Sequence, residues 1–79
     1  MRVDFDHQLE ALVAAAPSAA TPRRMLVEAL MRAYRWEAVV EHTKAYVHYY
    51  PQDHQFLEGV TAALRAAGRS DALAALAGR

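Results

Sequence analysis

Apolar residues recur at intervals of three and four along most of the chain, the spacing that places side chains on one face of an α-helix. The pattern predicts five helices, over about residues 4–16, 22–33, 37–50, 53–67 and from Ser70 onward. No stretch alternates apolar and polar residues as a half-buried strand does. Because short connections favour antiparallel neighbours, the predicted fold class is all-α, a short array of antiparallel helical hairpins.

Residues with strong positional preferences mark the predicted helix ends. Pro17 and Pro51 end the first and third helices, because proline cannot continue a helix. Thr21, followed by a proline suited to the first helical position, is a predicted N-cap. Asp53 is the predicted N-cap of the fourth helix, and Gly68 is its predicted C-cap, where a left-handed residue is needed.

Each predicted helix has a set of residues expected to face inward. These sets are Phe5, Leu9, Leu12, Val13 and Ala16; Leu26, Ala29, Leu30 and Ala33, widened by Val27, Met31 and Tyr34; Ala38, Val39, His42, Ala45, Tyr46 and Tyr49; Phe56, Leu57, Val60, Ala63, Leu64 and Ala67; and Ala72, Leu73 and Leu76. The third helix also has a predicted outer face, made of Glu37, Glu41, Lys44 and His48.

The chain repeats itself after 34 residues. The segment 35–39 returns as 69–73, and Pro17, Ala29, Leu30 and Ala33 return as Pro51, Ala63, Leu64 and Ala67. A fixed period of this length is typical of stacked helical hairpins. We expect one domain over residues 1–79, divided into a half unit at 3–16 and units at 17–50 and 51–79.

These units resemble the tetratricopeptide repeat. The residues that carry the resemblance are Leu26, Ala29, Trp36, Ala38, Ala45 and Pro51 in one unit and Val60, Ala63, Gly68 and Ala72 in the next. The turn inside each unit is one residue shorter than the family pattern, and Tyr34 stands where the turn glycine is usual. The resemblance implies a short α-solenoid that binds partner proteins along its concave face.

The residues that the resemblance places on this concave face are Thr21, Arg24, Glu28, Met31 and Arg32, then Gln55, Glu58, Ala62 and Arg65. One interpretation is a groove of mixed charge for an extended or helical peptide. The other is an ordinary solvated face with ion pairs such as Arg24–Glu28. Tyr34 and Tyr50 are further candidate contacts, because no inner stripe needs them and tyrosine is enriched at interfaces. Tyr46 and Tyr49 either join them or pack inside with their hydroxyls in water.

Each of the two predicted terminal helices contains a run of apolar residues without charge. Residues 72–77 read Ala-Leu-Ala-Ala-Leu-Ala, and residues 11–16 form a similar run. Repeat arrays need polar end units for solubility. We therefore expect either a homo-oligomer or an obligate complex with a different protein. For self-association, the predicted contact residues are Leu73 and Leu76.

Composition and charge exclude other classes of function. Lys plus Arg equals Asp plus Glu at nine each, so no net charge attracts nucleic acid or a membrane, and neither is predicted as a partner. There is no cysteine, and the start of the chain lacks the pattern of a signal peptide, so we expect a cytoplasmic protein. His42 and His48 are six residues apart rather than the four typical of metal ligands on one helix. No catalytic motif or phosphate loop occurs, so no enzyme activity, metal or cofactor is predicted.

The sequence favours a protein–protein interaction module, such as a small adaptor, assembly factor or chaperone that holds a peptide or helix of its partner. The alternative is a regulatory or docking segment of a larger enzyme or transcription assembly. A third hypothesis is nucleic-acid binding through Arg23, Arg24, Arg32, Arg35 and Arg65.

Overall fold

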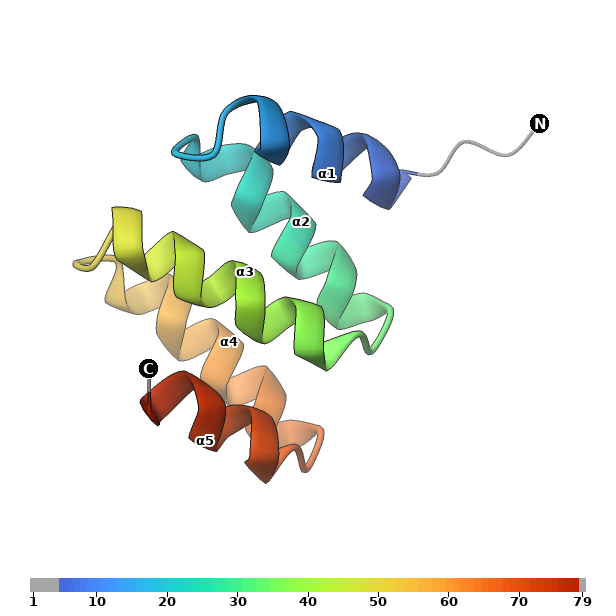
Figure 1. The fold of residues 1–79 in the computed structure, drawn as a ribbon. Helices are drawn as coiled ribbons and strands as arrows, with labels where there is room; N and C mark the ends of the chain where they lie inside the picture. The colour runs from blue at the N-terminus through green and yellow to red at the C-terminus, as the bar shows by residue number, and fades with distance from the viewer. Residues whose placement is uncertain (1–4, 79) are drawn as a thin grey trace.

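The computed structural model describes residues 5–78, with side chains described from 7 to 77. These residues form five α-helices: α1 (Phe5–Ala15), α2 (Ala20–Arg32), α3 (Trp36–Tyr49), α4 (His54–Ala66) and α5 (Ser70–Gly78) (Figure 1). The all-α class is confirmed, and the described residues contain no strand. Asp4 and the side chains of Phe5 and Asp6, which we placed in the first helix, lie outside the described residues.

The predicted N-cap of α4 is confirmed, and the predicted N-cap of α2 is wrong. The C-cap of α4 is Ala67, and Gly68, predicted for that place, is the left-handed residue directly after it. Asp53 precedes α4, and its carboxylate accepts a hydrogen bond from the Phe56 backbone N–H. Helix α2 begins at Ala20, so Thr21 lies inside the helix and the capping residue, Ala19, makes no side-chain hydrogen bond. The proline after Thr21 fits there because the first turn of a helix has no intrahelical partners for its N–H groups.

Consecutive helices pack against one another, and α3 also packs against α5. Figure 1 shows neighbouring helices running in opposite directions, with α1 and α5 at opposite ends of the stack. Helix α3 therefore has three neighbours, α2, α4 and α5, whereas α1 makes its main contact with α2 alone. This difference decides how wide a face each helix buries.

The 34-residue offset reappears in the hydrogen bonds of the two turns. The N–H of Tyr34 donates to the Met31 carbonyl at 3.1 Å, and that of Arg35 donates to the Leu30 carbonyl at 3.0 Å. The same two bonds close the second turn, from Gly68 to Arg65 and from Arg69 to Leu64, at 3.1 and 3.0 Å. The residue at the centre of each turn is left-handed, with φ of 59° at Tyr34 and 70° at Gly68. The predicted repeat thus corresponds to two turns of the same backbone geometry.

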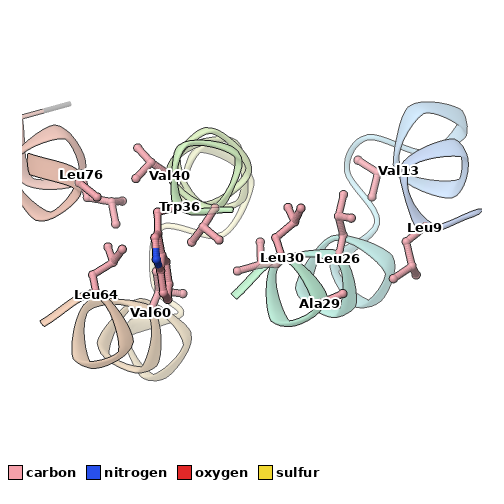
Figure 2. Close-up of a cluster of buried hydrophobic side chains, with 13 residues drawn as sticks. Leu9, Val13, Leu26, Ala29, Leu30, Trp36, Val40, Val60, Leu64 and Leu76 are labelled. Carbon is pink, nitrogen blue, oxygen red and sulfur yellow. The ribbon is translucent and has the colours of Figure 1, made fainter. Parts of the chain in front are cut away.

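The core extends through all five helices. Figure 2 shows Leu9 and Val13 of α1 facing Leu26 of α2, while Trp36 lies with Val40, Val60 and Leu64 between α3 and α4. Trp36, Val40 and Thr43 are buried although the predicted inner stripe of α3 omitted them. The outer face predicted for α3 is exposed at Glu37, Glu41, Lys44 and His48.

Several residues predicted to face inward are exposed instead. They are Leu12, Ala16, Ala33, Tyr34, Tyr49 and Ala67. The stripe predicted for α1 was too wide, because a helix with one main neighbour buries a narrow strip, here Leu9 and Val13. Leu12 lies at the edge of this strip and is 54% exposed. The stripe predicted for α3 was too narrow, because that helix packs against three others.

Candidate partner-binding groove

A groove of about 460 Å³ lies between α2 and α4 and contains part of the predicted concave face. Its lining residues are Thr21, Arg24, Met25, Glu28, Met31, Gln55, Phe56, Gly59 and Val60. We call this the α2–α4 groove. Five of the residues that the resemblance pointed to, namely Thr21, Arg24, Glu28, Met31 and Gln55, are brought together there.

The α2 side of the groove follows from the periodicity of that helix. Leu26, Val27 and Leu30 are buried against the other helices. Residues that flank this strip around the helix, including Arg24 and Glu28, are exposed to solvent along the groove. Met25 adds an apolar side chain that is 42% exposed. The α2 side thus combines opposite charges with flexible apolar groups.

The α4 side of the groove contains a glycine in the middle of a helix. Gly59 lies between Phe56 and Val60, which contribute apolar surface. A Cβ atom added at Gly59 would have no atom within 4 Å apart from its chain neighbours and its own helix backbone. The groove is therefore open at Gly59, and packing within the chain does not require a glycine there.

Arg24 and Glu28 lack the ion pair that would make them an ordinary solvated face. Within the described part of the chain, the ion pair found is Arg69–Asp71, with nitrogen and oxygen 3.1 Å apart. Arg24 and Glu28 are both exposed. The cation and the carboxylate are thus available to groups of opposite charge on another molecule.

Hydrogen bonds among Tyr46, Asp53 and Phe56 hold the start of α4 in place beside the groove. The buried Tyr46 hydroxyl donates to the Asp53 carboxylate, which also accepts from the Phe56 N–H at 3.2 Å. The Tyr46 hydrogen bond and then the Phe56 N–H hold the pKa of Asp53 below its usual value. Burial, with the Asp53 carboxylate, raises the pKa of Tyr46 to about 12. The Tyr46 ring lies 4.4 Å from that of Phe56 between centroids, so α3 positions the lining of the groove.

The tyrosines of α3 divide between the core and the surface. Tyr46 packs inside but its hydroxyl donates to Asp53 instead of reaching water, whereas Tyr49 is exposed. The Tyr50 hydroxyl donates to the Ser18 carbonyl, which ties the end of α3 to the loop before α2. Tyr34 is 77% exposed beside Trp36, in a left-handed conformation that is strained for a bulky residue. Neither Tyr34 nor Tyr50 lines the α2–α4 groove.

The other predicted contact residues also lie outside this groove. Arg32 and Glu58 are exposed on α2 and α4. Arg65 lines a different pocket, which it shares with Leu73 and Leu76. Leu76 is 5% exposed and is part of the core of its own chain, while Leu73 is half-buried. The self-association predicted for these two leucines stays a prediction, and replacing Leu76 would disturb folding as well as any interface.

Arg23 is a buried residue that sequence reasoning assigned to the surface. Its guanidinium donates to the Pro17 carbonyl at 3.0 Å and to Nδ1 of His42 at 3.2 Å. Because arginine only donates, that His42 nitrogen must be unprotonated. Burial, and then the Arg23 charge, lower the pKa of His42. The signal was present, since residue 23 lies three and four positions before the buried Leu26 and Val27.

This position of Arg23 removes one of the five arginines on which the nucleic-acid hypothesis was based. The described residues hold no cluster of three or more His, Cys, Asp or Glu side chains placed to bind a metal ion. A helix that crosses a bilayer needs about 20 largely apolar residues. None of the helices in the described part of the chain combines that length with that hydropathy.

Comparisons with known proteins add no identity to this geometry: no family model, curated protein or solved structure matches the chain.

Proposed function

We propose that this chain is a tetratricopeptide-like interaction module that holds a helix or an extended segment of a partner protein in the α2–α4 groove. An adaptor, an assembly factor and a chaperone would each use such a surface, and so would a docking segment of a larger assembly. The matching hydrogen bonds of the two turns, 34 residues apart, support the repeat arrangement on which this proposal rests.

The observation that carries the proposal is Gly59. A glycine inside a helix is about 1 kcal/mol less favourable than alanine, because it loses more backbone freedom on folding. Such a residue is often explained by a neighbouring helix that approaches too closely for a side chain. That explanation fails here, because the space beside Gly59 is open. A group outside the chain that must approach the helix backbone accounts for the missing side chain.

The chemistry of the lining fits a peptide segment. Met25 and Met31 offer flexible, polarisable surface, which adapts to differently shaped apolar side chains. Arg24 and Glu28 can then orient the segment through charges of both signs. The volume, about 460 Å³, falls within the usual range of ligand pockets, so it accommodates a few side chains of a peptide.

The test blocks the groove without harming the fold. Partners captured by the wild-type chain are identified by mass spectrometry, and their affinities are then measured for Gly59→Gln. Glutamine is a good helix former and its Cβ atom meets no other atom at this position, so the variant should fold at least as well as the wild type. The new side chain occupies the groove, so binding should weaken about tenfold or more.

The matched control is Ala74→Gln, which adds the same amide to an exposed helical position on α5. It should bind within about twofold of the wild type, since surface substitutions away from an interface have small effects. Equal affinity for the wild type and Gly59→Gln would refute binding in the α2–α4 groove. Loss of binding in both variants would instead indicate a nonspecific effect of the added amide.

A further inference from the structure

A second pocket, of about 380 Å³, opens where α4 and α5 meet α3. Its lining residues are Lys44, Val47, Leu57, Thr61, Arg65, Leu73, Leu76 and Ala77. We call it the end pocket. Five of the eight are apolar, both charged residues are cations, and none is a carboxylate.

The end pocket occupies a face that is covered in the preceding hairpin. Three of its lining residues, Thr61, Leu73 and Ala77, stand 34 residues after Val27, Val39 and Thr43. The three earlier residues are each fully buried, on helices that precede α4, and α4 packs against α3. Their later counterparts are half-buried or exposed. The face of the α4–α5 hairpin is therefore shaped like one that receives another helix, and no helix among residues 5–78 covers it.

An exposed apolar side chain that could enter the end pocket of another copy lies at the opposite end of the molecule, on α1. Leu12 is 54% exposed on α1, at the edge of the strip formed by Leu9 and Val13, which pack toward α2. The residues around it on the same side, Gln8, Ala11 and Ala15, are exposed and uncharged. Figure 1 shows α1 and α5 at opposite ends of the helix stack. A single chain thus cannot bring Leu12 to its own end pocket.

We propose that copies of this chain associate head to tail, with the outer face of α1 of one copy packed on the α4–α5 hairpin of the next and Leu12 inserted in the end pocket. The contact is heterologous, because the two copies use different surfaces, so it adds further copies or closes into a ring. In this contact, α1 of one copy would cover the α4–α5 hairpin of the next as α4 covers the α2–α3 hairpin within one chain. It lies apart from the α2–α4 groove and does not depend on that groove's function.

Charge also favours this occupant. Helix α1 has no basic residue in its last turn, where the unpaired carbonyl groups carry partial negative charge. Leu12 lies in that half of α1. Lys44 and Arg65 would come close to these carbonyls when Leu12 enters the end pocket. The surface around Leu12 carries no charge, so no cation of that surface would repel Lys44 and Arg65.

Two substitutions block the two sides of the contact while preserving the fold. Leu12→Lys changes an exposed residue and sets a cation against Lys44 and Arg65. Thr61→Glu fills the end pocket and places a carboxylate four residues before Arg65, a favourable helical pair. Unchanged circular dichroism would show that each variant is folded.

The measurement is sedimentation velocity at protein concentrations from the micromolar range up to about 1 mM. The average mass of the wild type should exceed that of the monomer and rise with concentration. Each variant alone should associate about tenfold more weakly or worse, because an anchor residue is lost from the centre of the contact. Met25→Lys, which changes another exposed apolar residue in the α2–α4 groove, is the control and should associate as the wild type does.

Mixing the two blocked variants gives the sharpest result. The Leu12→Lys copy keeps its end pocket and the Thr61→Glu copy keeps Leu12, so one contact can form between them. The mixture should therefore produce a 1:1 dimer and stop there. A monomeric wild type, or a mixture that stays monomeric while the wild type associates, would overturn the head-to-tail contact. The head-to-tail contact would also be overturned if the wild type associates and Met25→Lys is the one variant that disrupts this association.

Discussion

Replacing each of two glycines by alanine should change the stability of this protein in opposite directions. Both positions are exposed on or next to α4, and an added Cβ atom would meet nothing within 4 Å at either one. Neither substitution therefore gains or loses packing. The difference lies in the backbone, since Gly59 is helical while Gly68 has a φ of 70°.

The magnitudes follow from these conformations. Gly59→Ala should raise the free energy of unfolding by about 1 kcal/mol, the difference in helix propensity. Gly68→Ala should lower it by about 1 kcal/mol, because a left-handed conformation brings Cβ close to the following carbonyl oxygen. For a domain of this size, the two melting temperatures should differ by on the order of 10 °C.

Thermal and urea unfolding followed by circular dichroism give both values, with the wild type between the two variants. If Gly59→Ala lowered stability, the open space beside α4 would be wrong, and with it the argument that an external group approaches that helix. If Gly68→Ala raised stability, the left-handed turn after α4 would be wrong. Equal small effects in both variants would contradict the assignment of one position to a helix and the other to a turn.

Three further predictions concern buried polar groups. Thr43→Val should raise the free energy of unfolding by about 1 kcal/mol in a urea titration, because the fully buried Thr43 hydroxyl has no hydrogen-bond partner. The control, Thr21→Val at an exposed position, should change it by less than about 0.5 kcal/mol. The pKa of His42 in the folded state is lowered from 6.5, so the free energy of unfolding should stay constant above pH 6.5 and fall as the pH drops below it. In His42→Gln, the urea midpoint should no longer fall with pH in this range. A midpoint that falls as in the wild type would place the titrating group elsewhere. The pKa of Tyr46 is raised from 10.0 to about 12, so stability should fall as pH rises from 10 toward 12, and this loss should be absent in Tyr46→Phe if that hydroxyl is responsible.

Local sequence determined where most helices begin and end. Asp53 accepts the Phe56 N–H before α4, and Gly68 takes the left-handed turn after it, both as predicted from residue type. Such signals act within one turn of backbone, so they need no knowledge of the rest of the chain. The 34-residue repeat was also readable, because hairpins that pack alike need small and apolar residues at the same offsets. The predicted cap Thr21 is not the capping residue, because α2 starts two residues earlier than predicted and is preceded by Ala19.

How wide a face each helix buries was decided by the number of its neighbours. Leu12 and Tyr49 fit an apolar stripe as well as Leu9 does, yet both are exposed. Arg23 looked like a surface charge until the Pro17 carbonyl and His42 supplied its partners. Periodicity gives the phase of a helix, but the width of its buried face depends on the helices packed around it.

The candidate surfaces depend even more on tertiary structure. The resemblance to the tetratricopeptide repeat pointed to Arg24 and Glu28 on one helix, but only the packed helices show that they share a groove with Gly59. Nothing in the sequence distinguishes Gly59 from a glycine required by close packing, because that distinction rests on the empty space beside it. The end pocket likewise forms only where three consecutive helices, α3, α4 and α5, pack together. The sequence by itself determined the helices and their repeat, since these follow from local propensity and period, whereas the surfaces that can bind another molecule follow from which helices lie side by side.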